Sequence, residues 1–166
     1  MCKVRSMFIR KKAGGLKRFL NVTWDEIREA ERLGEKGMSF ELYDILEEAS
    51  IYGTELDERV EENIQYVLKR EGLLPRGASV LIPAGALHWE CPEGESCWYY
   101  ADFEVFDETG EKILARGSAT GSMLMLDEET AQLIDMTVWM PTNYVKKLKS
   151  LAMGLKSLIA AIFNPR

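Results

Sequence analysis

Apolar and aromatic residues alternate with polar residues along two adjacent stretches in the second half of the chain, at 96–107 and 112–126. Alternation with a period of two, enriched in aromatic and β-branched residues, is typical of half-buried β-strands. Asp107-Glu108-Thr109-Gly110, between the two stretches, has the polar residues and the glycine of a tight turn. The pattern therefore predicts one long antiparallel hairpin.

The second arm of this hairpin has almost no bulk in its middle. Alternation places Ala115, Gly117, Ala119 and Gly121 on one face of the strand. Glycine weakens a strand interior, so its presence there indicates that another group approaches the backbone closely. A packed helix, a second chain or a ligand would each meet this requirement.

Helical spacing of apolar residues predicts three helices. The first covers 40–52, with Leu42, Ile45, Leu46 and Ala49 on one apolar face, and the second covers 55–71. The third is an amphipathic helix at 143–163, which we expect to pack on the body or on a second subunit rather than on a membrane surface. A further strand is expected at 78–90, and two short strands (4–10 and 16–22) and a short helix reaching residue 33 are expected near the N-terminus.

These elements predict a single α+β domain over residues 1–166, with an antiparallel β-sheet wrapped around or packed on a central helix. The 166 residues are enough for one hydrophobic core, and 46% hydrophobic and 29% charged residues are typical of a soluble globular protein. The segment 1–20 is basic, the last 31 residues contain no acid, and all 27 acidic residues lie between them. We expect these basic ends to pack on the acidic body, which would itself repel nucleic acid.

The three cysteines, Cys2, Cys91 and Cys97, are too few for a disulfide framework. The N-terminus has no apolar stretch of the kind that forms a secretory signal. We therefore expect a cytoplasmic protein with reduced thiols.

Part of the chain resembles the hot-dog acyl-thioesterases. In that family a strand ending in Asp, a turn with Gly, an alanine-containing strand and an acidic stop recur. The matching features here are residues 104–118, Leu126-Asp127-Glu128-Glu129-Thr130, Met140-Pro141 and the Pro75-Arg76-Gly77 entry to a strand, so the resemblance covers about 75–141.

The resemblance implies a sheet wrapped around one apolar helix, a homodimer or other homo-oligomer, and binding or hydrolysis of an acyl thioester carried by coenzyme A or an acyl carrier. The helix at 40–52 would be the central one. The family's Asp-x-x-Gly-His-x-Asn-Asn motif is absent, because the only histidine is His88. No cofactor is implied.

Thioester hydrolysis needs a carboxylate and a donor that stabilises the oxyanion. Glu47 and Glu48 on the expected central helix are the candidate carboxylates, although both could be ordinary surface acids. His88 could assist as an acid or base, could bind a metal with Cys91 and Cys97, or could be a structural strand residue. The structural role is the commonest, and we predict no metal site.

The substrate is expected to lie against Trp98 and Tyr100 and over Gly117, Ala119 and Gly121. The competing hypothesis is a non-enzymatic module that binds a small ligand or a protein partner in an aromatic-lined cavity. A third class is a membrane-surface or scaffold protein that uses the C-terminal helix.

Overall fold

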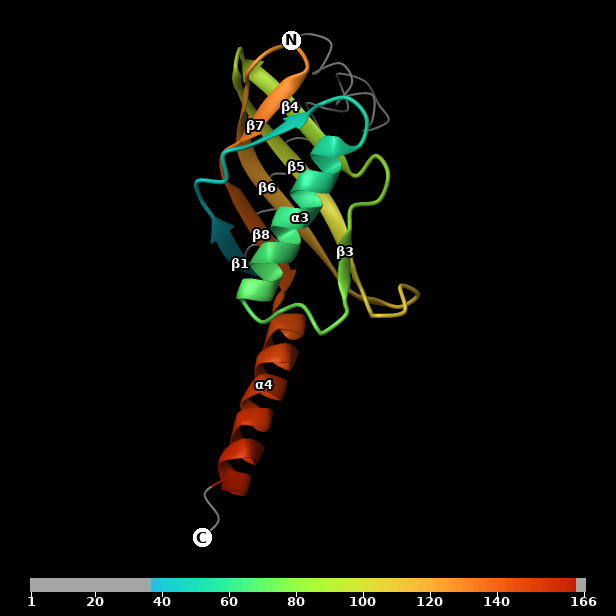
Figure 1. Ribbon diagram of the computed structural model, residues 1–166, viewed down its shortest axis with the longest axis vertical. Helices are drawn as coiled ribbons and strands as arrows, with labels where there is room; N and C mark the ends of the chain where they lie inside the picture. The colour runs from blue at the N-terminus through green and yellow to red at the C-terminus, as the bar shows by residue number, and fades with distance from the viewer. Residues whose placement is uncertain (1–36, 164–166) are drawn as a thin grey trace.

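The computed structural model describes residues 37–163, which form one antiparallel sheet and two helices (Figure 1). The predicted elements before residue 37 lie outside the described residues. In chain order the elements are β1 (Gly37–Leu42), β2 (Glu47–Ser50), α3 (Glu55–Arg70), β3 (Ser79–Leu81), β4 (Leu87–Glu93), β5 (Ser96–Phe106), β6 (Ile113–Met125), β7 (Thr130–Leu133), β8 (Met136–Pro141) and α4 (Thr142–Phe163).

The sheet is built around the β5–β6 hairpin. At its other edge β6 pairs with β8 and β7; β8 pairs in turn with β1, and β7 pairs with β2. At its other edge β5 pairs with β3 and β4. All of these pairings are antiparallel. The α+β class and the antiparallel sheet predicted from the sequence are therefore confirmed.

The central helix is α3, which crosses one face of the sheet (Figure 1). Its apolar positions repeat at helical spacing and are buried against the sheet: Leu56, Val60, Ile64, Val67 and Leu68. Acidic residues occupy its first turn and basic residues its last, which complements the helix dipole at both ends. The helix predicted at 55–71 is thus confirmed. We call the sheet face that it covers the inner face and the opposite face the outer face.

The helix predicted at 40–52 is wrong. Residues 37–42 pair with β8 and residues 47–50 pair with β7, so this segment is an edge of the sheet. Between them Asp44 and Leu46 adopt positive φ values of 53° and 54°, which are incompatible with a right-handed helix. The Ile45 N–H donates to the Ile134 carbonyl at 3.0 Å, so the edge stays attached through the interruption. Pairing with strands about ninety residues away outweighs the local helical spacing.

The predicted hairpin is confirmed, and the bulk-free stripe of β6 faces inward. Gly121 lies opposite Tyr99, and Gly117 lies opposite Phe103. A Cβ at Gly121 would come within 2.4 Å of the Tyr99 ring, and a Cβ at Gly117 within 2.5 Å of the Phe103 ring. The group that approaches the backbone is therefore an aromatic ring of the neighbouring strand, and both rings are buried beneath α3.

The strand predicted at 78–90 is two strands, β3 and β4. Pro83 has no N–H to donate to a ladder, and Gly85 adopts a φ of 78° in the turn between them. As a result β3 pairs with the end of β5 near Phe106, whereas β4 pairs with its beginning.

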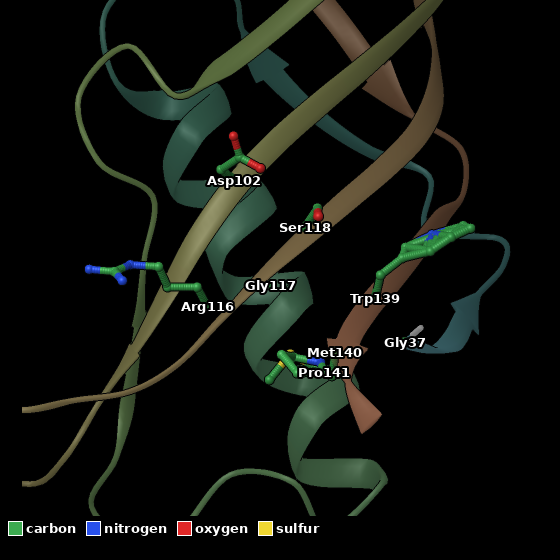
Figure 2. Close-up of a pocket in the computed structure, with 8 residues that line it drawn as sticks. All are labelled: Gly37, Asp102, Arg116, Gly117, Ser118, Trp139, Met140 and Pro141. Atoms are coloured by element: carbon green, nitrogen blue, oxygen red, sulfur yellow. The ribbon is translucent and has the colours of Figure 1, made fainter. Parts of the chain in front are cut away.

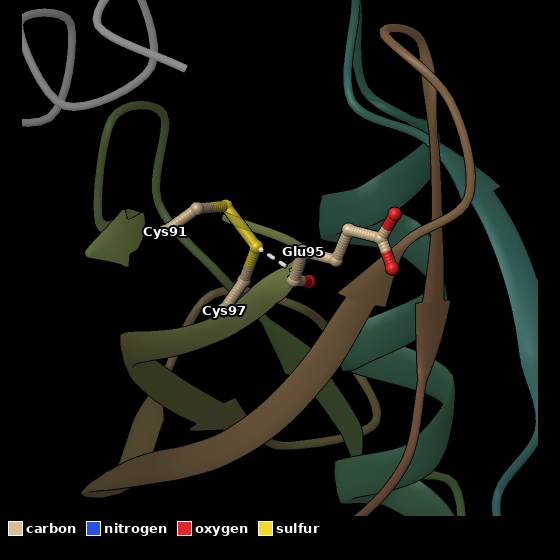
Figure 3. The surroundings of a disulfide bond; sticks show 3 residues. All are labelled: Cys91, Glu95 and Cys97. Carbon is tan, nitrogen blue, oxygen red and sulfur yellow. Dashed lines mark hydrogen bonds between the residues drawn. A yellow bond between two sulfur atoms is a disulfide. The ribbon is translucent and has the colours of Figure 1, made fainter. Parts of the chain in front are cut away.

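Cys91 and Cys97 form a disulfide that links β4 to β5 (Figure 3). The expectation that these thiols are reduced is therefore wrong. Both cysteines are buried near the end of the β4–β5 hairpin, where the strand register shifts between Glu90 and Glu93. The bond holds the hairpin end together where the regular ladder is interrupted.

The C-terminal helix predicted at 143–163 is confirmed as α4. Only its first turns contact the body, where Val145 is buried and Leu148 is partly buried. From Leu151 onward the helix projects away from the sheet (Figure 1). Of the two expectations for its apolar face, packing on the body is therefore wrong for most of its length, and packing on a second subunit stays a prediction.

We expect Gly121→Ala to destabilise the protein by about 1–3 kcal/mol, because the methyl group would overlap the Tyr99 ring and the Asp135 carbonyl. The free energy of unfolding from urea titration measures the effect. Gly154→Ala is the matched control, since a Cβ there meets nothing within 4 Å and alanine favours a helix. Equal effects of the two substitutions would contradict the close packing at Gly121.

Reduction of the disulfide should lower the free energy of unfolding by about 2 kcal/mol, the loop-entropy value for a short loop. Urea titration with and without a reductant tests this. A Cys91→Ser/Cys97→Ser variant should be as unstable as the reduced protein and should not respond to reductant. If the reductant does not change the free energy of unfolding of the wild-type protein, the bond does not stabilise the fold.

Candidate functional site

Polar side chains cross the outer face of the sheet in one row. Asp102 of β5 lies opposite Ser118 of β6, and Ser118 lies opposite Trp139 of β8. Directly opposite residues of antiparallel strands have Cβ atoms about 5 Å apart and point to the same face. Figure 2 shows the three side chains on neighbouring strands, with α3 behind the sheet.

A pocket of about 240 Å³ lies beside this row. Its walls combine the polar row and one charged side chain with residues that have little polar surface. The lining residues are Gly37, Asp102, Arg116, Gly117, Ser118, Trp139, Met140 and Pro141 (Figure 2). Pro141 is the last residue of β8, and α4 begins at the next residue. The pocket therefore lies where the sheet edge, the hairpin and the base of α4 meet.

The polar row provides a carboxylate and two hydrogen-bonding groups. Asp102 is exposed and accepts a hydrogen bond of 2.7 Å from the Tyr100 hydroxyl. Ser118 is buried, with 6% of its surface exposed. The Trp139 indole Nε1 is buried and has no hydrogen-bond acceptor within the described part of the chain. An unsatisfied buried donor costs free energy, so an acceptor supplied by a ligand would be favourable here.

Arg116 provides the positive charge of the pocket. Its Nε lies 3.2 Å from a carboxylate oxygen of Glu104, and 74% of its side chain is exposed. An ion pair this exposed contributes little stability, so the guanidinium can exchange its partner for another anion at small cost.

The structure does not bring the predicted catalytic residues together. Glu47 lies at the start of β2 on the inner face, where the Asn63 amide of α3 donates to its carboxylate at 3.3 Å. Glu48 is exposed. His88, buried on β4 opposite Tyr100, belongs to the outer face. Three strands separate β2 from β4, which corresponds to about 19 Å.

The predicted substrate-binding residues also divide between the two faces. Trp98 and Tyr100 point to the outer face, whereas Gly117, Ala119 and Gly121 carry the packing of the inner face. Only Gly117 contributes to the pocket, from its backbone.

The sequence pattern did not predict a functional role for Asp102, Arg116, Ser118 or Trp139. A signal was present, because polar residues alternate with the small ones on β6 and with the aromatic ones on β5. That alternation marks a polar outer face, but the register that aligns the three strands is not visible in it.

Metal ligation has no support among residues 37–163, where no group of three or more His, Cys, Asp or Glu side chains could hold an ion. The two cysteines considered as ligands are joined to each other. Within the same range, no helix is long and apolar enough to cross a membrane.

A second hollow, of about 280 Å³, lies along α3 and contains a carboxylate with a perturbed pKa. Burial raises the pKa of Glu61, and the charges of Asp57, Glu58 and Glu62 raise it further, although the N–H of Ile82 lowers it. That N–H donates to Glu61 Oε1 at 2.9 Å, so the carboxylate fastens β3's end to the helix.

Because the pKa of Glu61 is higher in the folded than in the unfolded protein, its ionisation should oppose folding. Wild-type stability should therefore fall, relative to Glu61→Gln, as the pH rises from about 4 through the raised pKa. Urea titrations over this range measure the difference, and the Gln side chain can still accept from Ile82. Glu128→Gln, at an exposed position whose charge is not among those that act on Glu61, is the control. A Glu61→Gln difference that does not vary with pH would contradict the assignment.

Comparison with protein-family models, with curated proteins and with solved structures gave no match to this chain. The description of the site therefore depends on its own geometry.

Proposed function

We propose that the outer-face pocket binds a short acyl thioester and that the protein hydrolyses it. The row formed by Asp102, Ser118 and Trp139 carries this proposal, because it places a carboxylate and two potential hydrogen-bond donors at the wall of a pocket with a largely apolar lining. Small-ligand sites typically combine such an apolar lining with a few convergent polar groups.

The chemistry assigns one role to each side chain. Asp102 accepts a proton from a water molecule as that water attacks the thioester carbonyl carbon. The Ser118 hydroxyl and the Trp139 Nε1–H donate to the oxyanion that develops on the carbonyl oxygen. When the intermediate collapses, the C–S bond breaks and the leaving thiolate takes the proton that Asp102 holds, which gives a thiol and a carboxylic acid and returns Asp102 to its carboxylate form.

The size and charge of the pocket limit the range of substrates that we propose. A volume of about 240 Å³ is slightly below the usual range of about 300–1,000 Å³ for small-molecule sites, which favours a short acyl group. Arg116 lies at the pocket with most of its own side chain exposed, and its guanidinium can bind a phosphate of coenzyme A or of a carrier's prosthetic arm.

The architecture supports the same class of function. In a hot-dog fold an antiparallel sheet packs around one central helix, and here α3 crosses the inner face and contacts β1, β2 and β3. The resemblance assigned the central position to 40–52; in the hot-dog arrangement that we propose, α3 takes this position instead. The homodimer implied by the resemblance stays part of the proposal.

A non-enzymatic binding module is the second candidate. The position of His88 favours it, because His88 is not among the residues that line the pocket and the pocket wall therefore has no histidine to shuttle protons. Binding without turnover would distinguish this candidate from the hydrolase.

Purified protein should bind acetyl-CoA and release coenzyme A from it, with weaker activity on palmitoyl-CoA. Asp102→Asn should lower kcat/KM by about 100-fold, the usual contribution of one general base. Trp139→Phe keeps an aromatic ring but removes the indole N–H together with the five-membered ring that carries it, and it should lower kcat by about 10-fold through the loss of one oxyanion donor. Thiol release measures turnover by the wild type and by both variants, and isothermal titration calorimetry measures the binding of acetyl-CoA.

Glu48→Gln is the control, because it removes an equally exposed carboxylate that is distant from the pocket. Turnover by Asp102→Asn at the wild-type rate, or an absence of binding to every acyl-CoA by a folded protein, would contradict the proposal. Loss of activity in Glu48→Gln alone would return the catalytic role to β2.

A further inference from the structure

The projecting part of α4 exposes a series of large apolar side chains that no other element of the described chain covers. Residues 149–162 are all exposed, including the large side chains Leu151, Leu155 and Leu158 at 61%, 58% and 57%. The helix is about 33 Å long at about 1.5 Å per residue, and most of that length extends beyond the sheet (Figure 1). Leaving such a surface in water is unfavourable, so it indicates a partner.

The apolar residues of α4 form one broad face. With about 100° per residue, the large aliphatic positions from residue 148 onward gather on one side of the helix, and they are Leu148, Leu151, Leu155, Leu158, Ile159 and Ile162. Lys147 borders this face on one side, and Lys149 and Lys156 border it on the other. Lysines in this position can extend their charged ends toward water while their aliphatic stems cover apolar surface.

The charges of α4 argue against self-association of this face. The helix carries Lys146, Lys147, Lys149 and Lys156 and contains no acidic residue. Pairing two copies along the apolar face would bring lysines together at both borders, with no carboxylate on the helix to offset them. An anionic surface would instead be complementary to them.

We propose that α4 is an interfacial anchor that binds the surface of an anionic lipid bilayer. Its leucine and isoleucine face enters the boundary between headgroups and acyl chains, and its lysines contact the lipid phosphates and other anionic headgroups. This mode agrees with the finding that no described helix can cross a membrane.

The base of α4 fixes how the body would sit above the lipid. Val145 is fully buried, the Tyr144 hydroxyl donates to the Leu73 carbonyl at 2.7 Å, and Lys149 Nζ lies 5.8 Å from the centre of the Phe40 ring. The helix is therefore joined to the sheet by packing as well as by the chain. Because the whole protein carries a net charge of −6, an anionic surface repels the body while it attracts the helix.

Co-sedimentation of the full chain with vesicles tests the anchor. We expect binding to vesicles of phosphatidylcholine with phosphatidylglycerol, and at least 10-fold weaker binding to phosphatidylcholine alone or at high salt. Leu155→Ser/Leu158→Ser should reduce binding at least 10-fold, and Lys147→Gln/Lys156→Gln should remove the preference for the anionic vesicles. All of these positions are exposed, so the thermal unfolding midpoint of the body should not change.

Met153→Ser is the matched control, because Met153 is 69% exposed but lies on the opposite side of the helix. This variant should bind like the wild type. Equal binding to neutral and anionic vesicles, or unchanged binding by Leu155→Ser/Leu158→Ser, would overturn the proposal. It would also be overturned by a protein that ignores vesicles and forms oligomers that the double leucine variant dissociates, since a second copy would then cover the face.

Discussion

The fit between two aromatic rings of β5 and two glycines of β6 is the constraint on which the rest of the structure depends. Tyr99 and Phe103 occupy the space directly above Gly121 and Gly117, so the inner face of the sheet is level enough for α3 to pack on it. The Tyr99 hydroxyl, buried in this layer, donates to the Asp135 carbonyl at 2.9 Å and so ties β5 to the β7–β8 connection. Burial at this position raises the Tyr99 pKa.

The same connection is held from β6. The Asp135 carboxylate accepts the Ser122 N–H at 3.0 Å and the Ser122 hydroxyl at 2.8 Å. One strand, β6, can therefore pair with β8 along its middle and with β7 near its end, although the two partners are separate strands. This sharing aligns Ser118 with Trp139 and hence creates the polar row of the outer face.

The elements with self-contained periodicity could be predicted from the sequence. The β5–β6 hairpin, α3 and α4 each repeat their apolar positions over more than ten residues, and local pattern is sufficient for that length. The segment 40–52 could not be predicted in this way, because its helical spacing is coincidental and its conformation is set by β7 and β8. Its interruption places Asp44 and Leu46 at positive φ without a glycine to signal it.

The candidate site was harder to predict than the fold, because it is assembled by register. Asp102, Ser118 and Trp139 are neighbours only because three strands align at one level of the sheet. The small residues of β6 were a correct indication of close approach, but the approaching group belongs to the same protein. Glycines in a strand therefore identify a packing requirement first, and a ligand only where no side chain already fills the space.

The position of Pro141 has a thermodynamic consequence for the whole molecule. This residue lines the pocket and directly precedes α4, so one short stretch of backbone belongs to both. Any reorientation of the helix that displaces Pro141 alters the pocket wall, and any ligand that prefers one position of that wall prefers one orientation of the helix. Such a coupling is reciprocal. If a partner bound to the helix changes the affinity of the pocket for its ligand by some factor, that ligand changes the affinity of the helix for its partner by the same factor.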